Sequence, residues 1–107
     1  MLIDLAIAAY FTLVPATLNF GVVPVGSMAV RTVTVLNNSD ETISDIQAGG
    51  LPISFQIMNH CIAALEPGES CTIDIAFRPF ADGIERTAMR VTSSSGRMNV
   101  SVFAQAD

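Results

Sequence analysis

The sequence predicts an all-β fold in which two sheets of short strands pack together as a sandwich. Turn-forming residues recur at fairly even intervals along the 107 residues, as they do between the strands of such folds. These turns are Pro24-Val25-Gly26, Asn37-Asn38-Ser39-Asp40, Gly49-Gly50, Pro67-Gly68, Ala81-Asp82-Gly83 and Ser93-Ser94-Ser95-Gly96. The segments between the turns are rich in Val, Ile, Thr and Phe, and no stretch beyond residue 15 keeps a helical period.

We expect seven strands, at residues 16–20, 28–37, 42–48, 53–58, 70–78, 84–93 and 98–104. The first, third and fourth are placed by the turns that bound them. The second alternates, with Val33 and Val35 on one face and threonines on the other. One face of this strand is therefore expected to lie in the core.

The fifth strand, residues 70–78, alternates most strictly. Its inward residues are Cys71, Ile73, Ile75 and Phe77, and its outward ones include Thr72 and Asp74. Pro79 has no backbone N–H to give to a neighbouring strand, so we expect it to end this one.

The last two strands each supply an inward pair, Met89 with Val91 and Val100 with Val102. Ile84 is out of phase with Met89 and Val91. Either a bulge lies near residues 86–87, or Ile84 belongs to the preceding loop.

Residues 1–15 form an apolar arm or first strand ahead of the sandwich, which we expect at residues 16–107. The arm is too short for a membrane span, which takes about 20 residues, and it lacks the basic segment of a signal peptide. It is either an extended strand on its own sandwich or a strand added to a neighbouring copy or another protein, and its first ten residues also match a short helix. If the arm pairs outside the chain, its interface residues are Leu2, Ile3, Leu5, Ile7, Tyr10, Phe11 and Leu13.

Three sequence motifs resemble those of one protein family. They are Leu18-Asn19-Phe20-Gly21 with the residues up to Ser27, Cys61 with Leu65-Glu66-Pro67-Gly68-Glu69-Ser70-Cys71, and Phe77-Arg78-Pro79 with Gly83. In this order and spacing they resemble the hydin-type or PapD-like immunoglobulin-like domains, which recur in long bacterial surface proteins and in ciliary proteins. The resemblance covers residues 16–104 and implies a seven-stranded immunoglobulin-like β-sandwich with a non-catalytic role. It carries no active-site residues.

Cys61 and Cys71 are separated by nine residues and flank Glu66-Pro67-Gly68-Glu69, a sequence suited to a type II turn. We expect a disulfide across this turn, worth about 3 kcal/mol through the entropy of the unfolded chain. Buried free thiols and a metal site are the alternatives. A metal needs more ligands than two thiols, and His60 is the candidate for a third.

The charge and composition exclude some classes of function. The chain has five Arg, no Lys and ten Asp and Glu residues, which gives a formal net charge of -5. Nucleic-acid binding needs clustered cations, so this composition argues against it. A catalytic triad would have to join His60 to Ser54, Ser70 or Asp74 without a supporting motif. We therefore expect no enzyme activity, no cofactor or metal, and no nucleic-acid or small-molecule partner.

The turn at residues 37–41, with Asp45 nearby, offers oxygen ligands of the kind that calcium favours. The twelve-residue calcium-loop pattern is absent. We interpret these residues as a turn that uses Asn and Asp for their backbone tolerance.

The function predicted on these grounds is that of a non-enzymatic structural assembly subunit. Because the sequence begins at Met1, shows no export signal and stops just after the last expected strand, we expect a complete single-domain product. A phage virion protein (capsid decoration, neck or tail) or a filament subunit fits this best, with itself or other structural proteins as partners. The alternative is a binding or adhesion module of a bacterial surface or envelope complex. The expected location is the virion or the cell surface.

Overall fold

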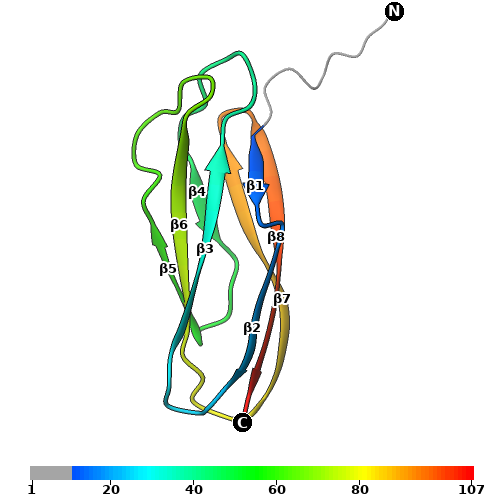
Figure 1. Ribbon diagram of the computed structural model, residues 1–107. Coiled ribbons are helices and arrows are strands. Elements are labelled where there is room, and N and C mark those ends of the chain that lie inside the picture. The colour runs from blue at the N-terminus through cyan, green and yellow to red at the C-terminus, as the bar shows by residue number, and fades with distance from the viewer. Residues whose placement is uncertain (1–10) are drawn as a thin grey trace, which may run out of the picture.

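The computed structural model describes residues 11–107, which form two four-stranded sheets packed face to face (Figure 1). The strands are β1 (Thr12–Val14), β2 (Thr17–Val23), β3 (Ala29–Leu36), β4 (Gln47–Gly49), β5 (Phe55–Asn59), β6 (Ser70–Phe77), β7 (Gly83–Ser93) and β8 (Gly96–Ala106). One sheet has the order β1-β3-β6-β5 and the other β2-β8-β7-β4. The all-β sandwich is confirmed, with eight strands in place of seven.

The core lies between the sheets and follows the period of two that the sequence shows. Val33, Val35, Ile73 and Ile75 on one sheet, and Met89, Val91 and Val100 on the other, have no exposed surface. Toward the end where β6 finishes, Phe20, Phe55 and Phe77 form an aromatic cluster whose ring centroids lie 4.8 to 5.8 Å apart. This burial is the main source of stability for a chain of this size.

The additional strand is β1, which pairs antiparallel with β3. The chain then passes across Pro15 to the other sheet, where β2 runs parallel to β8. Residues 11–14 therefore belong to the sandwich, while residues 1–10 lie outside the described part of the chain.

The strand expected at residues 42–48 is present only in its last two residues, because β4 begins at Gln47 and residues 42–46 form no strand. Ile43 instead forms an isolated bridge with Leu65, in the other sheet's half of the molecule. Asp45 has φ 57°, a left-handed conformation that interrupts an extended chain. The segment thus crosses from one sheet to the other before β4 begins.

Both alternatives for Ile84 are also wrong, because β7 pairs with β8 without interruption from Gly83 to Ser93. Ile84 lies on the outer face of β7 and is 57% exposed. The irregularity of this sheet lies instead in β2, between Asn19 and Val22. There Gly21 adopts φ 66° and donates its N–H to Asn19 Oδ1 at 2.8 Å, so Leu18, Phe20 and Val23 can all face the core.

Candidate functional site

A disulfide joins Cys61, just after β5, to Cys71 in β6. The turn that it spans is of type II, since Glu69 N–H donates to Glu66 O at 3.0 Å and Gly68 has φ 85°. We call this part of the sandwich, with the neighbouring turn at residues 37–41, the disulfide end. In Figure 1 it lies at the top.

Asn37 is the buried polar residue that holds the disulfide end together. Its Nδ2 donates to the carbonyls of Glu41 at 2.7 Å and Leu65 at 2.9 Å. Its Oδ1 accepts from the N–H and the hydroxyl of Ser39 at 3.0 and 2.6 Å. All the donors and acceptors of the Asn37 side chain therefore have partners, and these hydrogen bonds hold the turn in place; we call them the turn lock. This agrees with the interpretation of residues 37–41 as a turn.

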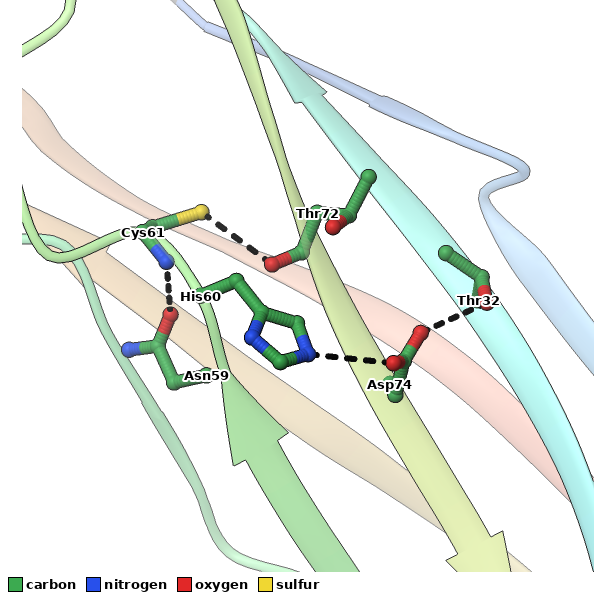
Figure 2. A network of polar contacts seen from close by, with 6 residues as sticks. All are labelled: Thr32, Asn59, His60, Cys61, Thr72 and Asp74. Atoms are coloured by element: carbon green, nitrogen blue, oxygen red, sulfur yellow. Dashed lines mark hydrogen bonds and ion pairs between the residues drawn. The ribbon is translucent and has the colours of Figure 1, made fainter.

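On the outer face of the same sheet, Asp74 joins β3 to the start of the 60–70 loop (Figure 2). Thr32 Oγ1 donates to Asp74 Oδ1 at 2.6 Å, and His60 Nε2 lies 3.1 Å from Asp74 Oδ2. The hydrogen bond from Thr32, followed by that from His60, lowers the pKa of Asp74 below its usual 3.8. The contact of Cys61 Sγ with Thr72 O, at 3.7 Å, is a packing contact because a disulfide sulfur carries no proton.

Of the residues that a triad with His60 would need, the structure brings only Asp74 to the histidine. Ser54 lies beyond the other end of β5, and no hydrogen bond of the described residues links Ser70 to either group. A serine nucleophile would have to bond the histidine on the side away from the carboxylate. The arrangement is therefore a clasp between strands and not an assembled acid–base site.

Among residues 11–107, no group of three or more His, Cys, Asp or Glu side chains is placed to hold a metal ion. No helix in the same range is long and apolar enough to cross a membrane.

The opposite end of the sandwich presents large apolar side chains to solvent. Seven of the ten exposed large hydrophobic residues in the described chain gather there: Val22, Val25, Met28, Val30, Ile53, Phe80 and Ile84. Ile53 is 88% exposed and Phe80 is 69% exposed. We call this region, which lies at the bottom of Figure 1 where the chain reaches Asp107, the apolar end.

Main-chain hydrogen bonds fix the loops of the apolar end to one another. Gly26 N–H donates to Pro79 O at 3.0 Å, and Arg78 N–H donates to Ser54 O at 2.8 Å. Between these loops a hollow of about 310 Å³ opens, lined by Met28, Ile53, Gln56, Ala76, Arg78 and Phe80 among others. Because its loops are tied, this surface is already formed before any partner arrives.

One edge of β7 near this end has no neighbouring strand in the described part of the chain. β4 pairs with β7 only opposite Arg90, Val91 and Thr92, and no strand of residues 11–107 pairs with this edge from Gly83 to Met89. We call this stretch the open edge. An uncovered strand edge is a ready template for another strand.

The direction of the main-chain groups at the open edge follows from two hydrogen bonds. Ser94 N–H donates to Ser44 O at 2.8 Å on the β4 side, and Ser101, opposite Ala88, donates its N–H to Ala16 O at 3.1 Å, away from β7. Since the two kinds of pair alternate along an antiparallel ladder, the even-numbered residues of β7 turn their N–H and C=O groups away from β8. Ile84 and Arg86 therefore present unpaired main-chain groups to solvent.

Beside the open edge, a cavity of about 130 Å³ leads between the two sheets. Its lining includes Ser54, Phe77, Phe80, Ile84, Glu85 and Ala106. Ser54 is only 8% exposed, and its Oγ has no hydrogen-bond partner among the described residues. A buried hydroxyl without a protein partner is rare in folded proteins, and either an ordered water or a ligand group can satisfy it.

The interface residues predicted from the arm divide into two groups. Leu2, Ile3, Leu5, Ile7 and Tyr10 lie outside the described residues. Phe11 and Leu13 are 4% and 5% exposed and pack in the chain's own core, which corrects their prediction as interface residues. Phe80 and Ile53 were not predicted, although a Phe between Pro79 and Gly83 was a readable signal of an apolar loop.

The fold is shared with solved structures that differ widely in sequence. The ASH / PapD-like domain of human CEP192 matches with a TM-score of 0.71 and 11% identity, over 91% of this chain and 84% of that one. The Vibrio cholerae VesB protease matches with a TM-score of 0.68 and 18% identity over 94% of this chain, which spans about a third (32%) of that protein. An MSP family member of Caenorhabditis elegans matches with a TM-score of 0.56 and 10% identity, over 91% of this chain and 97% of that one.

A search of curated proteins found no match. The family model for abnormal spindle-like microcephaly-associated, ASPM-SPD-2-Hydin (ASH) domains matches residues 6–100, which is most of the chain. This match includes the strands that carry the Leu18-Asn19-Phe20-Gly21 and Phe77-Arg78-Pro79 sequences, and it agrees with the PapD-like sandwich. The chain therefore belongs to the ASH (ASPM-SPD-2-Hydin) family.

Proposed function

We propose that the chain is a structural subunit that docks onto other proteins through its apolar end, as part of a larger assembly. The ASH/PapD-like fold is a non-enzymatic fold that mediates protein–protein interactions. The observation that carries the proposal is the gathering of seven exposed large hydrophobic side chains at one end. Three of them, Met28, Ile53 and Phe80, line one hollow, and clustered exposed apolar side chains mark interaction sites in stable proteins.

The specific form that we propose is a virion component, such as a capsid decoration, neck or tail protein, or a filament subunit. Its partners are further copies of itself or other structural proteins. The disulfide supports a location outside the reducing cytoplasm, on a virion or at a cell surface. The net charge of -5 supports a protein partner over nucleic acid.

A second candidate is a binding or adhesion module of a bacterial surface or envelope complex. It is supported by two longer proteins in which a domain of this fold makes up only part of the chain. The chain spans 32% of the Vibrio cholerae VesB protease and 23% of a family 123 glycoside hydrolase from Clostridium perfringens. In those proteins the fold is one part of a larger molecule.

Imaging of the native particle or fraction that contains the chain separates these functions. A structural subunit appears in regular repeats in the images, whereas a recognition module appears once in each complex. A native chain that is monomeric, with no protein bound to it in gentle extracts, contradicts both.

A further inference from the structure

We infer that the open edge of β7 binds the first ten residues of a second copy of this chain as an added strand. The inference rests on the proposed docking function and names its partner. Strand addition uses main-chain hydrogen bonds for affinity and alternate side chains for specificity. The open edge offers both, because Ile84 and Arg86 present main-chain groups and the cavity beside them can receive a side chain.

The length of the incoming segment fits the edge. Residues 83–89 of β7 span about 23 Å at the usual rise of a strand. Ten extended residues span about 33 Å, so residues 1–10 can cover the whole edge and leave a connection of about three residues to Phe11. A shorter apolar tail would not reach along the edge.

The alternation of the first ten residues also fits. Phe11, just before β1, and Leu13, within it, are both buried, and the same odd-numbered phase continues back through Ile7, Leu5 and Ile3. An added strand places alternate residues toward the inner side of the sheet. The aliphatic side chains at these odd positions would enter the cavity lined by Phe77 and Ala106.

The even-numbered residues then face outward, on the side where Arg86 is exposed. They are small or polar apart from Leu2 and Tyr10, and they include Asp4, which is the acidic residue of the segment. An added strand in this phase places the carboxylate of Asp4 on the same outer face as the Arg86 guanidinium, and opposite charges on neighbouring strands attract.

The donor has to be a second copy, because the chain's own segment cannot reach. β1 lies at the far edge of its sheet from β5, while the open edge lies on the β4 side of the other sheet. After covering the edge, three residues bridge about 10 Å, whereas the sandwich is 29 Å across. The donated strand therefore passes between molecules, from the disulfide end of one copy to the apolar end of the next.

The test combines two full-length variants with complementary defects. Arg86→Pro removes an outward N–H of the open edge and breaks no bond to β8, so the fold should persist. Leu5→Asp with Ile7→Asp places two charges on the inward face of the donated strand. The matched controls are Arg86→Ala, which keeps the N–H, and Ala6→Asp with Ala8→Asp, which places the same two charges on the outward face.

Light scattering should give wild-type masses above 11.3 kDa that rise with concentration. Each defective variant alone should be monomeric, with its dissociation constant raised about tenfold or more. An equimolar mixture should form a heterodimer, because one variant still has the segment and the other still has the edge. The control Ala6→Asp with Ala8→Asp should associate like the wild type. Arg86→Ala keeps the N–H and loses only the attraction to Asp4, so it should weaken association much less than Arg86→Pro.

A monomeric wild type, association that survives either defect, or a mixture that stays monomeric would each overturn the inference. Hydrogen exchange of the wild type provides a test without any variant. The amides of Ile84 and Arg86 should exchange more slowly as concentration rises, while that of Thr87, which already faces β8, should not change. Equal exchange of all three at every concentration also overturns the inference. The proposed docking function survives such a result if a foreign protein still binds the apolar end.

Discussion

At the disulfide end, polar side chains and a covalent bond are used inside the molecule, while at the apolar end large hydrophobic side chains are left to solvent. The side-chain amide of Asn37 makes all of its hydrogen bonds to its own turn and to Leu65, whereas Ser54 near the other end has a buried hydroxyl with no hydrogen-bond partner among residues 11–107. The two ends of the sandwich therefore have different roles. One end holds the fold together, and the other is available for a partner.

The largest effect on stability should come from loss of the disulfide. Replacing both cysteines, Cys61→Ala with Cys71→Ala, should lower the free energy of unfolding by about 3 kcal/mol, because the unfolded chain gains the freedom of the opened loop. Urea unfolding of the variant and of the reduced wild type should give matching values. A change below about 1 kcal/mol would show that the disulfide end does not depend on its bridge.

The next effect should come from the turn lock. Asn37→Ala should cost about 2 kcal/mol, because the carbonyls of Glu41 and Leu65 lose their donor. Asn38→Ala, at an exposed neighbouring position, is the control and should stay within about 0.5 kcal/mol of the wild type. Thermal unfolding measures both, and equal effects would remove the special role of Asn37.

A change of opposite sign is expected at Ser54. Ser54→Ala removes a buried hydroxyl that has no hydrogen-bond partner in the described part of the chain, and it should leave the stability unchanged or raise it by up to about 1 kcal/mol. Ser39→Ala, which loses hydrogen bonds to Asn37 and Glu41, is the matched control and should be destabilising. If Ser54→Ala is the more damaging change, the hydroxyl has a structural role and the cavity is not poised for a ligand.

The smallest effect should be the pH dependence of the clasp at Asp74. Its pKa is lowered in the folded state, so its contribution to stability is present above the usual value of 3.8 and is lost as the pH falls through the folded pKa. Thr32→Val removes the largest cause and should raise this pKa toward 3.8, as NMR titration would measure. An unchanged titration would mean that His60 alone sets it.

The sequence predicted those parts of the fold that depend on local pattern. The alternation from Cys71 to Phe77 correctly gave the inward face of β6, and the Glu66–Glu69 turn with its flanking cysteines gave the disulfide. Both follow from neighbours along the chain, because strand pleating and turn geometry are set within a few residues.

Features that depend on distant segments could not be predicted in the same way. The outward position of Ile84 follows from its unbroken pairing with β8, and the crossing at Asp45 follows from the contact of Ile43 with Leu65. The open edge exists because β4 is short, which is a property of the whole sheet and not of the β7 sequence. The apolar end gathers residues from loops far apart in the chain, so only the folded arrangement brings Met28, Ile53 and Phe80 together.

The most direct test of the two-end account compares Ile53→Ser with Ile62→Ser. The two isoleucines are almost equally exposed, at 88% and 91%, but Ile53 lies at the apolar end and Ile62 at the disulfide end. Both variants should unfold within about 0.5 kcal/mol of the wild type. Only Ile53→Ser should weaken binding to the native assembly, by about tenfold or more, in a co-sedimentation assay. Equal binding of the two variants, or a loss confined to Ile62→Ser, would contradict the account.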